Sequence, residues 1–151
     1  MPYSVKKTDH DKALERHRER LYLLTFISGL ANLLLIFLHL IDGHNVISGI
    51  LLGATVGSLI IGAIRSNTDS YYQSLSTVGL RWAAFAIGII ALVLLPISAK
   101  SNSLVTIFAP GLLPYTTDEA LIVLLICLAY HLGFSYAFMR DWISDLGTDH
   151  E

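Results

Sequence analysis

The sequence predicts an all-α integral membrane protein in which four transmembrane helices form an antiparallel bundle. Of its 151 residues, 54% are hydrophobic and only 15% are charged. Four apolar stretches are long enough to cross a hydrocarbon core of roughly 30 Å, which takes about 20 helical residues. The predicted spans are 21–41, 46–64, 77–98 and 119–139. A charged segment (1–20), three connections and a tail (140–151) remain, which leaves no room for a soluble catalytic domain.

Basic residues predict the orientation of the chain. Six of the ten Lys and Arg residues precede the first span, namely Lys6, Lys7, Lys12, Arg16, Arg18 and Arg20. Lys and Arg are enriched on the cytoplasmic side of a membrane, and an even number of spans returns the chain to the side where it started. We therefore expect both termini in the cytoplasm and the protein in the bacterial cytoplasmic (inner) membrane.

The first span is predicted to be retained rather than cleaved as a signal peptide. Its apolar run exceeds the 7–15 residues of a typical signal-peptide core, and no small-residue cleavage site follows it. Acidic and basic residues each recur every four positions along 9–20. This pattern predicts a charged helix that leads into the span.

The connections carry turn and interface signals. The turn Asp42-Gly43-His44-Asn45 is short enough to pair the first two spans, with Gly43 giving backbone freedom and Asn45 capping the next helix. Tyr71 and Tyr72, in a predicted loop over 65–76, are expected in an aromatic belt, and Trp82 and Trp142 at the inner interface. The loop 99–118 is expected along the outer surface, with a re-entrant hairpin as the alternative.

Two stripes of small residues predict close helix packing. Gly49, Gly53 and Gly57 recur every four residues in the second span, and Ala129, Gly133 and Ala137 do so in the fourth. Such spacing places small residues on one helix face, where two backbones approach closely. The preferred interpretation is packing within the bundle, and contact with another subunit is the alternative.

Candidate metal ligands are expected at the outer rim, where His39, Asp42 and His44 lie near the first turn and Asp118 and Glu119 open the fourth span. Each also fits an ordinary structural role: a histidine in the last turn of a helix suits its dipole, Asp42 belongs to a turn, and Thr116 and Glu119 fit a capping box. The histidines within the spans, His39 and His131, are expected at heights about 15 Å apart, too far apart to ligate one haem within the chain. The sequence therefore predicts neither a metal nor any other cofactor.

The predicted spans contain few polar residues at depth. Asn32 and His131 are expected at similar depth, joined by a hydrogen bond between the first and fourth spans. Arg81 is expected to extend to the inner headgroups or to pair with Asp69, Asp141 or Asp145. Cys127 is the one cysteine of the chain, which excludes an intramolecular disulfide or a redox pair.

Three functions follow from these features. The leading hypothesis is a non-enzymatic membrane protein that acts through helix contacts with other membrane subunits or with itself, without a nucleic-acid partner. A transporter or channel for a small ion, proton or metal is the first alternative, although the sequence predicts no polar line through the depth of one helix. The second alternative is a small enzyme acting on a lipid or quinone near Arg81 and His131.

Overall fold

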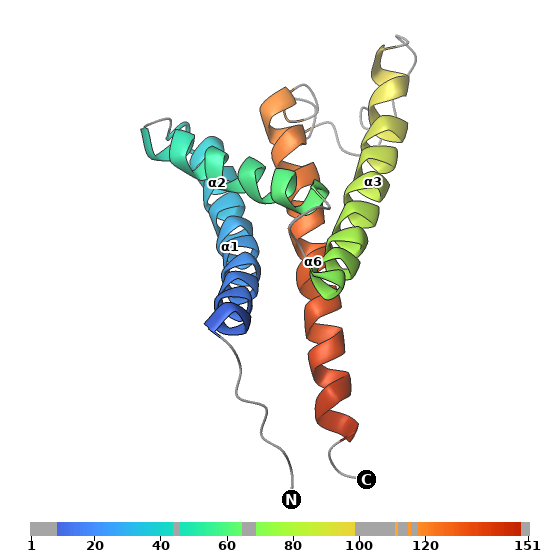
Figure 1. Ribbon diagram of the computed structural model, residues 1–151. Coiled ribbons are helices and arrows are strands. Elements are labelled where there is room, and N and C mark those ends of the chain that lie inside the picture. Colours follow the sequence, from blue (N-terminus) through green and yellow to red (C-terminus); the bar gives the residue numbers. More distant parts are fainter. Residues whose placement is uncertain are drawn as a thin grey trace, which may run out of the picture.

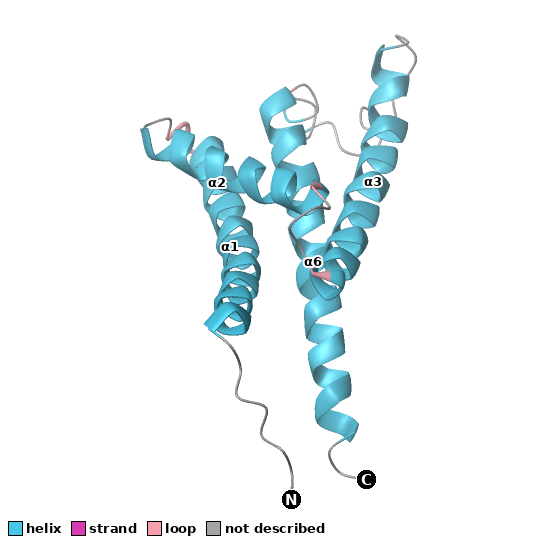
Figure 2. Cartoon of the chain, in the orientation of Figure 1, coloured by secondary structure: helices cyan, strands magenta, loops and turns pink. Residues whose placement is uncertain are grey.

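The computed structural model describes residues 9–43, 46–64, 69–98 and 118–148, together with 111 and 115. The described residues form four long helices: α1 (Asp9–Leu40), α2 (Val46–Ala63), α3 (Ser70–Ser98) and α6 (Glu119–Thr148) (Figures 1 and 2). Each contains a stretch long and apolar enough to cross a membrane. The prediction of an all-helical chain with four helices long and apolar enough to cross a membrane is therefore confirmed.

The charged N-terminal segment is continuous with the first span. Helix α1 runs without interruption from Asp9 to Leu40, so residues 9–20 extend the span as predicted. The helix ends in a Schellman turn, in which the Gly43 amide donates to the Leu38 carbonyl (2.8 Å) and the Asp42 amide to the His39 carbonyl (3.2 Å). The left-handed residue is Asp42, with φ of 53°, whereas Gly43, which was predicted to give the turn its backbone freedom, has no positive φ. Asp tolerates this conformation because its short polar side chain can bond locally.

The third helix begins earlier than predicted. Helix α3 starts at Ser70 rather than at 77, because Asp69 caps it: its Oδ1 accepts a hydrogen bond of 2.6 Å from the Tyr72 amide. The added turns carry Tyr72 into the core, where its side chain is 1% exposed. Placing Tyr72 in an aromatic belt was therefore wrong, whereas Tyr71 is 40% exposed.

The fourth helix starts at the predicted residue but differs in its capping residue and in its end. The Asp118 carboxylate accepts a hydrogen bond of 3.0 Å from the Leu121 amide. Asp118 is therefore the N-cap, and Glu119 is the first helical residue rather than the capping-box partner of Thr116. The helix continues to Thr148, so most of the predicted tail is helical. His44, Asn45, Thr116 and almost all of the loop 99–118 lie outside the described residues.

The helices differ in how they contact one another. The most extensive contact joins α3 to α6, followed by α1 with α2 and α1 with α6. The start of α1 and the end of α6 lie toward the bottom of Figure 1, whereas the α1–α2 turn and the start of α6 lie toward the top. Helix α2 runs from that turn toward the middle of the molecule, where its end approaches α3 and α6.

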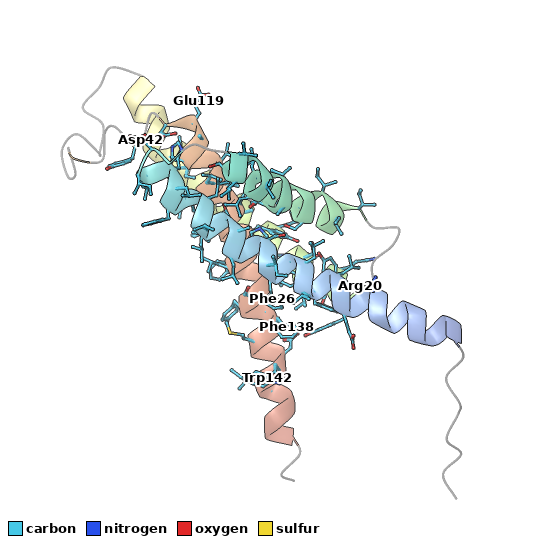
Figure 3. All side chains as sticks on the ribbon, turned by 90° about the vertical axis from the view of Figure 1, so that its left-hand side faces the viewer. Arg20, Phe26, Asp42, Glu119, Phe138 and Trp142 are labelled. Carbon is cyan, nitrogen blue, oxygen red and sulfur yellow. The ribbon has the colours of Figure 1, made fainter. Side chains whose placement is uncertain are left out.

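An aromatic core holds α1, α3 and α6 together. Its buried residues are Tyr72, Leu75, Phe134 and Ala137. Phe26 of α1 meets Phe138 of α6 with ring centroids 5.2 Å apart and a T-shaped geometry (Figure 3). Such edge-to-face pairs are favourable beyond the apolar area that they bury.

Candidate functional site

A line of polar side chains follows one face of α1. Tyr22, Thr25, Ser28 and Asn32 are spaced by three or four residues, and His39 follows two turns later. Thr25, Ser28 and Asn32 are at most 2% exposed. The apolar Leu35 separates this line from His39, so the line does not continue through the whole depth of the helix. The predicted buried polar residues included Asn32 but not Thr25 or Ser28. The i, i+3, i+7 spacing of Thr25, Ser28 and Asn32 was the signal that could have revealed the line.

Hydroxyl groups connect this line to the other helices. The Thr25 Oγ1 and Tyr72 Oη atoms share a hydrogen bond of 2.8 Å between α1 and α3. The Tyr22 hydroxyl donates to both carboxylate oxygens of Asp69, at 3.2 and 3.3 Å. Ser28 donates to the Ala54 carbonyl of α2 at 3.0 Å. The first turns of the α1 span are therefore hydrogen-bonded to α2 and to the start of α3.

A second group of hydroxyls joins the remaining helices. Tyr130 of α6 is fully buried, and its hydroxyl shares a hydrogen bond of 3.1 Å with Ser76 of α3. Ser76 also donates to the Gly62 carbonyl at the end of α2, again at 3.1 Å. Since lipid supplies no partner for such groups, these bonds keep the hydroxyls satisfied inside the protein.

Three glycines make this packing possible, and of these only Gly133 was predicted to have a packing role. A Cβ on Gly62 would overlap the Tyr130 hydroxyl and lie 2.8 Å from the Ser76 Oγ. A Cβ on Gly79 would lie 2.8 Å from the Tyr130 carbonyl oxygen and 2.9 Å from its ring. A Cβ on Gly133 would lie 2.7 Å from Trp82 Cγ. On α6, Gly133 and Ala137 of the predicted stripe are buried against α3 and the aromatic core.

The glycine stripe of α2 behaves differently. A Cβ on Gly49, Gly53 or Gly57 would meet nothing within 4 Å in the part of the chain that the structure describes. At 100° per residue, this face lies roughly 170° from the buried Thr55 and Ser58. Within the described residues this stripe therefore makes no close contact, and α2 turns its other face, with Thr55 and Ser58, inward. Packing of the stripe, inside the bundle or against another subunit, stays a prediction.

Asn32 and His131 both lie in the interface of α1 and α6, as predicted, but no hydrogen bond joins them. The Asn32 amide donates instead to the Leu124 carbonyl at 3.1 Å. Within the described residues, the Asn32 Oδ1 and both ring nitrogens of His131 are buried without a hydrogen-bond partner. The backbone carbonyl of α6 is the nearer acceptor because Asn32 faces α6 about two turns before His131.

A contact joins α1 to α6 at the end of the molecule that holds the α1–α2 turn. His39 Nε2 lies 2.6 Å from Asp118 Oδ2, at the end of the molecule where Asp42 and Glu119 are labelled in Figure 3. The amide of Leu121 and the His39 side chain hold the pKa of Asp118 below its ordinary value of 3.8. Among the described residues, no three His, Cys, Asp or Glu side chains gather as a metal site.

No family model, curated protein or solved structure matches this chain. Its candidate site therefore rests on the geometry alone.

The predicted inner-interface residues do not form one cluster. Trp82 packs on Gly133 and stacks near Tyr136, with ring centroids 5.8 Å apart. Trp142 is 60% exposed on α6. Arg81 is exposed, and the two predicted acids whose side chains the structure describes bond elsewhere: Asp69 caps α3, and Asp141 accepts from Arg140 at 2.7 Å. The predicted ion pairs of Arg81 with these acids are therefore not formed.

Proposed function

We propose that this protein acts through helix contacts in the membrane, as an accessory or assembly subunit of a larger complex or as a homo-oligomer. The observation that carries the proposal is the uncovered glycine face of α2, formed by Gly49, Gly53 and Gly57. Only 11% of the α2 span is buried, against 44% of the α6 span. Close approach of backbones is the main attraction between helices already dissolved in lipid, and this face is the surface of α2 best suited to it.

The test compares Gly53→Leu with Gly88→Leu. Gly88 of α3 is a matched control, because a Cβ there also meets nothing within 4 Å of the described chain and it belongs to no glycine stripe. We expect both variants to keep the wild-type melting temperature as monomers. Gly53→Leu should lose the assembly that light scattering and mass spectrometry detect after purification in mild detergent, and Gly88→Leu should keep it. Unchanged assembly in Gly53→Leu would remove the basis of the proposal.

The proposed topology places both termini in the cytoplasm of a bacterial inner membrane, with the four spans as an antiparallel bundle. The basic residues before α1 support it, since Lys and Arg are enriched on the cytoplasmic side. Reporter fusions after Glu151 and within 101–115 should report opposite sides of the membrane. Reports from the same side would contradict this topology.

A proton or small-cation path is a second candidate function. It is supported by the polar line of α1, which reaches from Tyr22 beside Asp69 to His39 beside Asp118. Leu35 interrupts the line between Asn32 and His39, and it is 7% exposed. Liposomes that enclose a pH-sensitive dye should acidify faster with the wild type than with Asn32→Leu, and equal rates would exclude this path.

A further inference from the structure

A cavity of about 230 Å³ lies between α1 and α6. Its walls include Phe26, Leu30 and Leu33 from α1 and Leu128, His131 and Leu132 from α6. Leu30 and Leu132 are 67% and 51% exposed, so the cavity opens sideways toward the bilayer rather than toward water. A molecule that enters it must be dissolved in the membrane.

His131 is the polar group of interest in this wall. The residue is 3% exposed, and its two ring nitrogens have no hydrogen-bond partner among the described residues. A neutral imidazole carries one N–H donor and one acceptor nitrogen. A buried polar group without a partner is costly, and inside a membrane it indicates a functional contact.

Gly29 leaves the imidazole close to α1 without a side chain between them. A Cβ on Gly29 would lie 3.3 Å from His131 Cβ and 3.7 Å from its Nδ1. Gly29 also lines the cavity. The nitrogens are covered in this conformation, so the ring must rotate about its Cβ–Cγ bond to present its N–H to the cavity.

We propose that His131 donates a hydrogen bond to the carbonyl oxygen of a quinone-type molecule whose ring lies in this cavity. The apolar walls suit an uncharged ring and tail. The volume is below the roughly 300–1,000 Å³ of sites that enclose a drug-sized ligand. The cavity therefore holds one ring or a short chain segment, with the rest of the molecule in the bilayer.

Depth favours a quinone over the ester carbonyl of a lipid. His131 lies 12 residues after Glu119 and 13 before Ser144, the ends of the α6 span. At about 1.5 Å per residue, it is roughly 18 Å and 20 Å from these two ends. Lipid esters stay near the boundary of a hydrocarbon core roughly 30 Å thick. A freely dissolved quinone reaches the middle of the core.

The test measures binding of a decyl-substituted benzoquinone to the full chain in phosphatidylcholine nanodiscs by calorimetry. Decylbenzene is the control ligand, because it has the same chain and a ring without carbonyl groups. We expect saturable binding of the quinone, weakened about tenfold by His131→Phe and unchanged by His39→Phe, which alters a histidine outside this cavity. Equal binding of decylbenzene, equal binding by His131→Phe, or no binding above empty nanodiscs would overturn the proposal.

A second measurement uses the unaltered protein and so does not depend on the folding of a variant. The ¹⁵N signals of the His131 imidazole should shift when the quinone is added, both in ester lipids and in ether lipids that lack the carbonyl group. If exchanging ether for ester lipids produces the same shift without quinone, the lipid is the ligand and the quinone assignment is overturned.

Discussion

Gly79→Ala should destabilise the protein because the added methyl group has no space. Its Cβ would lie 2.8 Å from the Tyr130 carbonyl oxygen and 2.9 Å from the Tyr130 ring. Tyr130 is fully buried, so neither the backbone nor the ring can move away without disturbing its neighbours. Overpacking of this kind costs about 1–3 kcal/mol.

Gly88→Ala is the matched control, since it lies in the same helix and its Cβ would meet nothing within 4 Å of the described residues. Both substitutions gain the same helix propensity of about 1 kcal/mol. Their difference in unfolding free energy therefore isolates the overlap at Gly79.

The assay is thermal unfolding in one detergent, followed by circular dichroism. A difference of about 1–3 kcal/mol corresponds to about 2–12 °C for a chain of this size, at about 2–4 °C per kcal/mol. Gly79→Ala should melt below Gly88→Ala by an amount in this range. Equal melting temperatures would show that α3 and α6 do not approach each other at Gly79 as closely as the structure indicates.

Three further predictions concern the polar groups. Tyr130→Phe and Ser76→Ala should show a coupling free energy of about 0.6 kcal/mol in a double-mutant cycle, the average for hydrogen bonds between membrane helices, and additive effects would exclude their bond. His131→Phe should raise the unfolding free energy by about 1–3 kcal/mol, because it removes two unpartnered nitrogens. Chemical denaturation measures this free energy, and a value below that of the wild type would contradict the prediction. The pKa of Asp118 is lowered in the folded state, so the stabilisation from this carboxylate should be complete above about pH 3.8 and disappear as the pH falls through the lower folded-state pKa. Acid titration of Asp118→Asn should lack this loss of stability.

The sequence was sufficient to predict four helices long and apolar enough to cross a membrane, because apolar runs of this length seldom occur in soluble domains. Helix ends were harder to predict. Asp69 and Asp118 each cap a helix with a carboxylate, but a sequence offers several capping residues near every boundary. Because Asp69 is the residue that caps α3, the helix starts earlier than predicted, and Tyr72 lies in the core rather than at the predicted interface.

The candidate site was predicted only in part. Asn32 and His131 were correctly placed between α1 and α6, because amide and imidazole groups are conspicuous in an apolar helix. Their missing bond could not be foreseen, since backbone carbonyls compete as acceptors and Leu124 provides one. Thr25 and Ser28 were overlooked because small hydroxyl residues are common in membrane helices and do not by themselves mark a site.

The faces of α2 give the strongest link between its sequence and the proposed function. Thr55, Ser58 and Gly62 lie within about 60° of one another at 100° per residue, and this face packs inward, with Gly62 making room for Tyr130. Gly53, at the centre of the glycine stripe, lies on the opposite face. Internal packing accounts for Gly62, whereas the stripe makes no close contact with the part of the chain that the structure describes. A second helix packed on that face would give all the glycines of the stripe the same role.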